Sequence, residues 1–360
     1  MKSHMNWIKN SIIIIFISCL GGVLLIEGIL QLMKGKDDWK IISKANILRN
    51  FEFQYDISNL YKSKVSSVSY VRDEFGLRDN CYEIEDIDIL TIGGSTTDQR
   101  YVQFESTYQT VLQEKLRSKN LNFRCVTNAG IDGHSTWGHI FAFEHWFPLI
   151  PNLSPKFVLL YVGINDAGLD RIDSPKYIKI AKNNSRSIKG FLKQFEIAQR
   201  LLPIYRYLQS NKNSSVEYAG HKPNKYTIND YSIAKLNDET VALSQRNATA
   251  FKSRLETILH YAENLGATMI CVTQPHRYVM EKNGILYGVP DVLGKGFSGL
   301  DYDYSIREIN LVIGNLCGEN TLDLYNYEFS DDHFYDGIHT TAQGSEVIGN
   351  AMAKFIIERY

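Results

Sequence analysis

Residues 87–95 read IDILTIGGS, and this stretch indicates the class of fold. Its first six residues are mostly branched and apolar, as expected of a β-strand, and Gly93 and Gly94 end that strand. Ser95 follows directly, so its hydroxyl is expected on a tight turn with open backbone around it. The stretch lacks the Gly-Lys-Ser/Thr of a P-loop and the third glycine of a dinucleotide-binding motif, and Thr97 replaces the last glycine of a Gly-x-Ser-x-Gly turn.

Strands and helices alternate on both sides of this stretch. The apolar patterns predict further strands at 123–127, 157–162, 268–273 and 321–324, and helices at 105–118, 135–148, 240–265, 304–315 and 341–358. The run at 157–162 is continuously apolar, which is typical of a strand buried on both faces. The alternation predicts a three-layer α/β/α domain with a five-stranded parallel sheet. Sites in such sheets form at the carboxyl ends of the strands.

The N-terminal region contains a long apolar run. Residues 11–33 read SIIIIFISCLGGVLLIEGILQLM, and Glu27 is their only charge. As a helix this run would span about 30 Å of hydrocarbon. It is apolar on every face, which favours a transmembrane anchor over a buried core helix. No small-x-small cleavage site follows it, which favours an uncleaved anchor over a signal peptide.

The anchor sets the predicted domain organisation. We expect a short tail at 1–10, the anchor at 11–33, a linker and lead-in segment at 34–83, and one catalytic domain at 84–360. An insertion at about 168–240 is the expected source of substrate selection. The chain has 39 Lys and Arg against 40 Asp and Glu, which argues against a nucleic-acid partner. Lysines flank the anchor on both sides, so its orientation in the membrane stays open. The sequence also leaves the oligomeric state open.

Five cysteines are spread along the chain without a Cys-x-x-Cys pair. Their spacing argues against zinc fingers, iron–sulfur clusters and disulfide-dense scaffolds. Cys125 and Cys271 fall in predicted strands and are expected to be buried thiols. Cys81 and Cys317 would pair with each other only if geometry and compartment allow.

Two groups of residues can act together with Ser95. Asp336 and His339 lie three residues apart before the last helix, so the carboxylate can orient the imidazole while its other nitrogen faces a serine. Gly130 and Asn165 follow the second and third strands, where a backbone N–H and a side-chain amide can stabilise an oxyanion. The alternatives are turn and cap roles for these residues, and a metal site that adds Asp331, Asp332 and His333 to the Asp336 and His339 pair. No further ligand cluster supports the metal site, so no metal and no cofactor is expected.

The order of these blocks resembles that of the SGNH/GDSL hydrolase superfamily. The matching blocks are Gly93–Thr97, Asn128–Gly130, Gly163–Asp166 and Asp336–His339, and the resemblance covers about residues 84–358. Gly94 stands where the family pattern has an aspartate. The resemblance implies a flavodoxin-like fold and acyl-ester chemistry. Ser95 would be the nucleophile, His339 its base, and Asp336 the residue that orients the base. Ser95, Gly130 and Asn165 would form the oxyanion hole.

The resemblance leaves three functions open. An esterase that removes small acyl groups such as acetyl from a carbohydrate or another small ester is our first expectation. An acyltransferase to a glycan hydroxyl and a non-catalytic membrane-anchored scaffold or glycan-binding protein are the alternatives. The FGLR stretch at 75–78 and the anchor also resemble membrane-tethered members linked to bacterial surface polysaccharides, which implies an extracytoplasmic catalytic domain. Trp137, Trp146, Tyr101 and Tyr161 are either sugar-stacking or core residues.

Overall fold

A computed structural model describes residues 18, 21–22, 39–79, 81–119, 123–168, 226–233 and 235–360. The chain forms two compact units, Met1–Lys40 with Lys182–Ser215, and Ile41–Ala181 with Val216–Tyr360. Nearly all of the expected anchor at 11–33 and most of the insertion at 168–240 lie outside the described residues. Within the described ranges, no helix is both long enough and apolar enough to cross a membrane.

A five-stranded parallel sheet forms the centre of the larger unit. Its strand order is β4 (Cys125–Asn128), β3 (Ile87–Gly93), β5 (Phe157–Tyr161), β6 (Thr268–Val272) and β9 (Thr321–Leu322). All four neighbouring pairs are parallel. Every residue of β3, β4 and β5 is buried, in accordance with their apolar sequences. The five predicted strands and the parallel sheet are confirmed.

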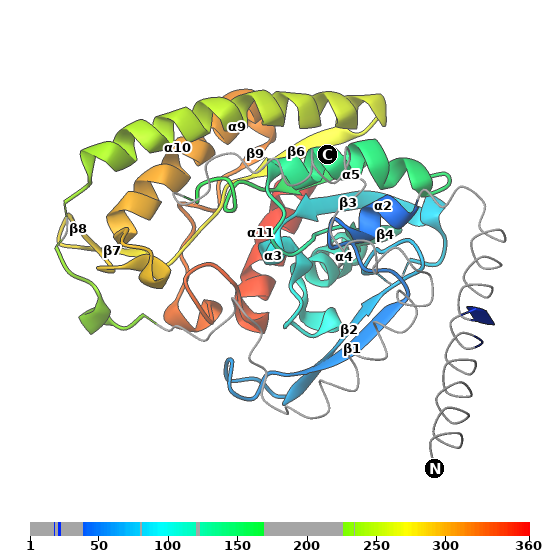
Figure 1. Cartoon of the computed structure of the whole chain (residues 1–360), viewed down its shortest axis with the longest axis horizontal. Helices are drawn as coiled ribbons and strands as arrows, with labels where there is room; N and C mark the ends of the chain where they lie inside the picture. Colours follow the sequence, from blue (N-terminus) through cyan, green and yellow to red (C-terminus); the bar gives the residue numbers. More distant parts are fainter. Residues whose placement is uncertain are drawn as a thin grey trace, which may run out of the picture. The chain divides into compact units, whose positions relative to one another are not determined.

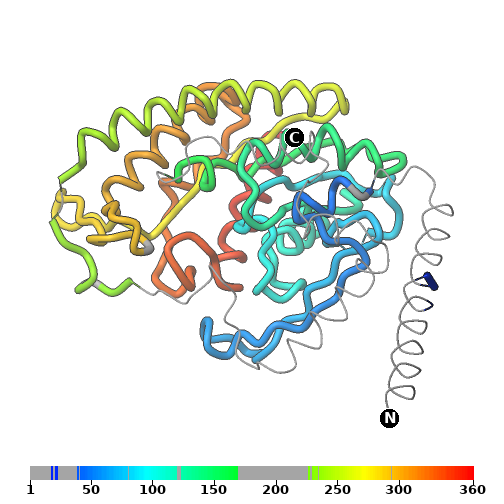
Figure 2. The backbone as a smooth tube through the Cα atoms, viewed as in Figure 1, coloured from blue at the N-terminus to red at the C-terminus, as the bar shows by residue number. Residues whose placement is uncertain are grey.

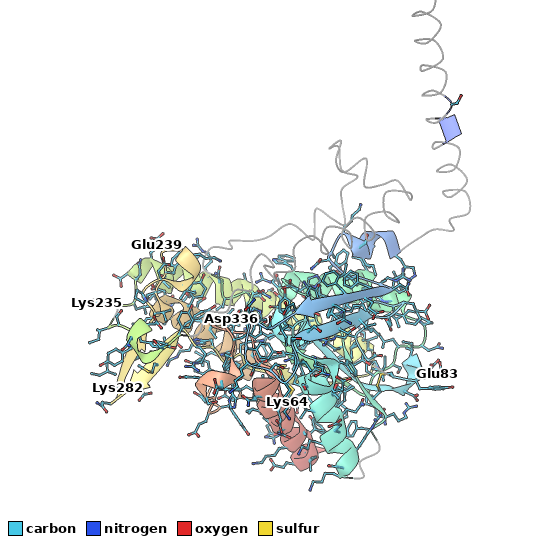
Figure 3. The ribbon with its side chains drawn as sticks, turned by 90° about the horizontal axis from the view of Figure 1, so that it is seen from below. Lys64, Glu83, Lys235, Glu239, Lys282 and Asp336 are labelled. Carbon is cyan, nitrogen blue, oxygen red and sulfur yellow. A yellow bond between two sulfur atoms is a disulfide. The ribbon has the colours of Figure 1, made fainter. Side chains whose placement is uncertain are left out.

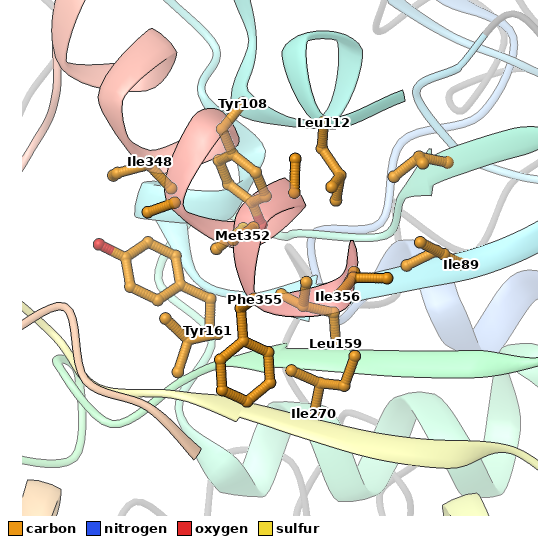
Figure 4. Close-up of a cluster of buried hydrophobic side chains, with 14 of the residues drawn as sticks. Ile89, Tyr108, Leu112, Leu159, Tyr161, Ile270, Ile348, Met352, Phe355 and Ile356 are labelled. Carbon is orange, nitrogen blue, oxygen red and sulfur yellow. The ribbon is translucent and has the colours of Figure 1, made fainter. Parts of the chain in front are cut away.

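Helices cover both faces of this sheet (Figure 1). One layer contains α4 (Tyr108–Ser118) and α11 (Ala342–Arg359), which pack against each other. The other layer contains α5 (Thr136–His145), α9 (Asp238–Asn264) and α10 (Gly299–Cys317). In Figure 4 the apolar side chains of α4 and α11 meet Ile89, Leu159 and Ile270 of the sheet in one buried cluster. Each predicted helix of this domain is present, with ends shifted by a few residues.

Shorter elements surround the three layers. The helices α2 (Trp39–Ser43) and α3 (Ser95–Asp98) are one turn long, and the strand pairs β1 (Phe51–Asp56) with β2 (Ser67–Arg72) and β7 (Val279–Lys282) with β8 (Ile285–Gly288) are antiparallel hairpins.

The lead-in segment differs from the expected linker. From Ile41 onward it belongs to the larger compact unit, in which the β1–β2 hairpin is the blue part of the tube at the lower edge of Figure 2. The Tyr70 hydroxyl of β2 donates to the Asp98 carboxylate of α3 at 2.7 Å. Buried rings of β1 and β2 pack on Tyr101 and Tyr335, which lie far along the sequence. The strands read FEFQYD and SVSYVR, with polar residues between most of the apolar ones, so neither contains a continuous apolar run.

Two disulfides correct the expectation for the cysteines. Cys125 and Cys271 are buried as expected, but each is bonded, Cys125 to Cys81 and Cys271 to Cys317. A pairing of Cys81 with Cys317 is therefore wrong. Each bond joins a strand of the parallel sheet to a segment 44 or 46 residues away, and such contacts between distant segments are set by the tertiary fold.

Removing the second disulfide is expected to destabilise the protein without changing its chemistry. Closing a loop of this length is worth about 4 kcal/mol in the chain-entropy account, within a usual range of about 2–5 kcal/mol. Cys317→Ser should therefore lower the free energy of unfolding measured in urea, and dithiothreitol should lower that of the wild type. A wild type whose unfolding midpoint is the same with and without reductant would contradict the expectation.

Candidate active site

Ser95 is the first residue of α3 and directly follows β3 and Gly94. A Cβ added to Gly94 would lie 2.4 Å from Asn165 Nδ2, a contact closer than real side chains make. Any side chain at this position, the aspartate of the SGNH/GDSL pattern included, would displace Asn165. The glycine therefore lets the turn that carries Ser95 and the loop after β5 approach each other closely.

The structure brings together Ser95, His339 and Asp336. His339 Nε2 lies 2.7 Å from Ser95 Oγ, and His339 Nδ1 lies 2.7 Å from Asp336 Oδ2. Asp336 Oδ1 also accepts hydrogen bonds from the backbone N–H groups of Ile338 (2.9 Å) and His339 (2.7 Å). The carboxylate thus fixes both the loop and the ring, as expected for a residue three positions before the histidine.

The surroundings keep this carboxylate charged and the ring in place. Burial by itself would raise the pKa of Asp336, but the charge of His339 and the hydrogen bonds outweigh burial and hold that pKa below its usual range. The ring of Tyr335 stacks on the His339 ring at 5.6 Å with an angle of 8° between the planes. Tyr61 stacks in turn on Tyr335 at 5.7 Å. The imidazole is therefore oriented by a carboxylate and by a stack of two rings.

Asn165 lies beside this group, on the loop after β5. Its Nδ2 donates to the backbone carbonyl of His134 at 2.9 Å, and the same atom faces Gly94. The neighbouring Asp166 is buried and accepts hydrogen bonds from the N–H and hydroxyl of Thr136 and from Arg254 of α9. Three elements, the β5 loop, α5 and α9, thus fix the position of the Asn165 amide.

Gly130 differs from its expected role. Its N–H donates to Asn128 Oδ1 at 2.8 Å, so this donor is already engaged within its own loop. An asparagine side chain that bonds the backbone two residues later is a common way to stabilise a turn. The next glycine of the loop, Gly133, is exposed and has a φ of 75°. Gly133 precedes His134, whose carbonyl accepts a hydrogen bond from the Asn165 amide. In the sequence it is the second glycine of the stretch NAGIDG, three residues after Gly130.

The side chains of the alternative metal site have other partners. Asp331 forms an ion pair with Arg277, and His333 Nδ1 accepts from the N–H of Ser330 at 3.0 Å. Asp336 and His339 bond each other. In the part of the chain that the structure describes, no three His, Cys, Asp or Glu side chains gather in a way that could hold a metal ion.

The aromatic residues considered for sugar stacking are mainly core residues. Trp146, Tyr101 and Tyr161 are all at most 1% exposed, so they cannot meet a ligand. A polar cavity of about 320 Å³ lies instead beside the Tyr61 and Tyr335 stack. It is lined by residues 61–64, Asp332, Thr341 and Gln343. Lys64 of this cavity and Asp336 are both labelled in Figure 3.

Gln99 has a role that the sequence did not indicate. Its Nε2 donates to the hydroxyls of Thr340 (3.1 Å) and Ser345 (2.5 Å), next to His339. Its backbone N–H donates to the carbonyl of Ser95 at 3.0 Å. Gln99 therefore joins the turn that carries the serine to the loop that carries the histidine. Nothing in the local sequence signals it, because its partners lie some 240 positions away.

No protein-family model matches this chain, and neither does any curated protein. Among solved structures, a lipase/acylhydrolase from Enterococcus faecalis is 16% identical with a TM-score of 0.41, over 76% of this chain and 97% of that chain. The acetyl xylan esterase AlAXEase is 14% identical with a TM-score of 0.39, over 74% and 98%. The esterase EstA from Pseudoalteromonas sp. is 12% identical with a TM-score of 0.39, over 75% and 96%. At this level of similarity the matches carry no functional argument.

Proposed function

We propose that the chain is a serine esterase of the SGNH/GDSL type that acts through an acyl-enzyme at Ser95. The observation that carries this proposal is the line of two 2.7 Å contacts from Asp336 through His339 to Ser95. A serine hydroxyl is a weak nucleophile unless a base removes its proton, and this arrangement supplies that base.

The proposed reaction follows from these contacts. Ser95 Oγ attacks the ester carbonyl while His339 Nε2 accepts its proton, and Asp336 stabilises the imidazolium through Nδ1–H. The imidazolium then protonates the departing alcohol, which leaves an acyl group on Ser95. A water molecule, deprotonated by His339, releases the acid and restores the serine.

The negative oxygen of the tetrahedral intermediate needs donors near Ser95. We assign this role to the N–H of Ser95, which as the first residue of α3 has no partner within the helix, and to the Asn165 amide. The N–H of Gly133 is our third donor in place of Gly130, because the Gly130 N–H bonds Asn128.

Replacing Asn165 by alanine is expected to lower kcat by about 10²–10³-fold, the usual cost of one oxyanion donor. KM for a small ester should change little, since the donor acts mainly on the transition state. Steady-state kinetics with p-nitrophenyl acetate measures both constants. A kcat close to that of the wild type would remove Asn165 from the oxyanion hole.

We propose a small acyl group, such as acetyl on a carbohydrate, as the natural target. The cavity that Tyr61 lines supports a hydroxyl-rich substrate, since lysine, serine, aspartate, threonine and glutamine side chains also line it. Transfer of the acyl group to a glycan hydroxyl is the alternative with the same acyl-enzyme. Incubation with an acylated donor and a candidate glycan separates the two, because hydrolysis yields free acid and transfer yields acylated glycan.

We also propose that the domain lies on the extracytoplasmic side of a membrane, held by an anchor at 11–33. Two disulfides support an oxidising compartment, where such bonds form and persist. Protease accessibility of the domain in intact cells tests this location.

Labelling with a serine-reactive fluorophosphonate separates an enzyme from a non-catalytic scaffold. We expect the detergent-solubilised wild type to be labelled and mass spectrometry to place the label on Ser95. If the wild type is not labelled under conditions where a known serine esterase is labelled, the proposal that the chain is a serine esterase is rejected.

A further inference from the structure

A buried cluster of arginines connects the lead-in segment to the catalytic loops. Arg72, the last residue of β2, has a side chain only 1% exposed and lies next to Asp98, which is 1% exposed and ends α3. Arg78 is also buried. Burying a guanidinium is costly unless its donors are paired, so the arrangement calls for an explanation beyond general stability.

Arg72 uses all five of its N–H donors. Its Nε donates to the Tyr70 hydroxyl at 2.7 Å, and one terminal nitrogen donates to the carbonyls of Gly76 (3.0 Å) and Asn128 (3.3 Å). The other terminal nitrogen donates to the Asp98 carboxylate and to the carbonyl of Gly130 at 2.5 Å. A guanidinium has five donors in a rigid plane, so this side chain is fully satisfied.

The partners of Arg72 belong to both sides of the proposed site. Asp98 is the last residue of the turn that starts with Ser95, and its N–H donates to the Gly94 carbonyl at 2.9 Å. Gly130 starts the loop that leads to Gly133 and His134. The two sides are in close contact, since a Cβ added to Gly130 would lie 2.5 Å from the Asp98 backbone nitrogen.

Neighbouring contacts hold the same loops from the lead-in segment. Arg78 donates to the carbonyls of Asp98 and Gln99, both at 2.8 Å, which satisfies carbonyl groups at the end of α3. On the other loop, His134 Nε2 lies 2.7 Å from the carbonyl of Ala45. The lead-in segment thus contacts both the Ser95 turn and the 128–134 loop. Of the side chains of Arg72, Arg78 and His134, that of Arg72 bonds both of these segments.

We propose that Arg72 is a positioning residue that holds the Ser95 turn in register with the 128–134 loop. The proposal rests on the proposed esterase function. The guanidinium touches no reacting atom; it sets the distance between the nucleophile and the oxyanion donors. A shift of about 1 Å between such groups can cost about 100-fold in rate.

The test compares Arg72→Met and Arg72→Lys with the matched variant Asp88→Asn. Asp88 is a buried carboxylate in β3, at the end of that strand farther from Ser95, and forms ion pairs with Lys156 at 2.9 Å and with Arg124. Its replacement is expected to destabilise β3 without touching the Ser95 turn or the 128–134 loop. Fluorophosphonate labelling to completion counts the competent sites, and kcat with p-nitrophenyl acetate is expressed per labelled site. The rate of labelling and KM are measured in parallel.

We expect kcat per labelled site to fall about 100-fold in Arg72→Met, with KM within about threefold of the wild type. Arg72→Lys should lose at least about tenfold, because an ammonium keeps the charge but cannot bridge the carboxylate and the carbonyls in one plane. Asp88→Asn should lower the melting temperature and leave kcat per labelled site unchanged.

The proposal is overturned if the Arg72 variants keep kcat per labelled site within about threefold of the wild type while their melting temperatures fall as in Asp88→Asn. If Arg72→Met does not fold, the proposal is judged on Arg72→Lys alone, and a kcat per labelled site within about threefold of the wild type overturns it. A wild type that neither turns over esters nor labels would overturn the proposed function, and this inference with it. An active wild type with unaffected Arg72 variants overturns the inference only.

Discussion

Replacing Ser95 by alanine is expected to lower kcat for p-nitrophenyl acetate by on the order of 10⁵–10⁶-fold, the scale seen when a serine nucleophile is removed from a triad. The reason lies in the geometry, since the Ser95 hydroxyl is the group that His339 Nε2 faces at 2.7 Å. Alanine removes the attacking oxygen and leaves the backbone donors of the turn in place. Residual turnover should come only from binding and oxyanion stabilisation.

The matched control for this prediction is Ser244→Ala. Ser244 is a fully buried serine of α9, so the change tests the loss of a hydroxyl without touching the site. Circular dichroism and melting temperatures should show both variants folded. Equal ester turnover by Ser95→Ala and the wild type would remove Ser95 as the nucleophile and with it the proposed mechanism.

Replacing Asp336 by asparagine is expected to lower kcat by about 10⁴-fold. The carboxylate accepts from His339 Nδ1 at 2.7 Å, which leaves Nε2 free to accept the serine proton. An amide of the same shape would donate to Nδ1 and leave the proton on Nε2, the wrong nitrogen for a base. Steady-state kinetics measures this loss, and circular dichroism with melting temperatures shows that the variant is folded.

The stability of the same pair gives an independent check by pH. The pKa of Asp336 is lowered in the folded protein, mainly by His339 against the opposing effect of burial. Its contribution to stability is therefore present above the ordinary carboxyl range near pH 4 and is lost as the pH falls through the folded pKa. Asp336→Asn should weaken this acid dependence of the melting temperature. Asp331→Asn, which breaks a surface ion pair with Arg277, serves as the matched control and should leave kcat unchanged.

The periodicity of the sequence was sufficient for the sheet and its covering helices. The strand at 157–162 and the helix at 240–265 are long, regular apolar patterns, and burial on a sheet follows directly from such patterns. The hairpin at 51–72 was missed although FEFQYD alternates as in a half-buried strand, because its aromatic rings pack on Tyr101 and Tyr335, which no local pattern shows. The disulfide partners were missed because cysteine spacing does not show which segments meet.

The sequence by itself determined the parallel sheet, the positions of Ser95 and Asn165 after two of its strands, and the three-residue spacing of Asp336 and His339 before the last helix, because these are local properties. Only the tertiary structure decided that Arg72 and Gln99 join the loops around Ser95. Arg72 and Gln99 bond residues as far as 58 and 246 positions away. Burial makes such contacts valuable, since a polar group out of water must find a partner wherever the fold supplies one.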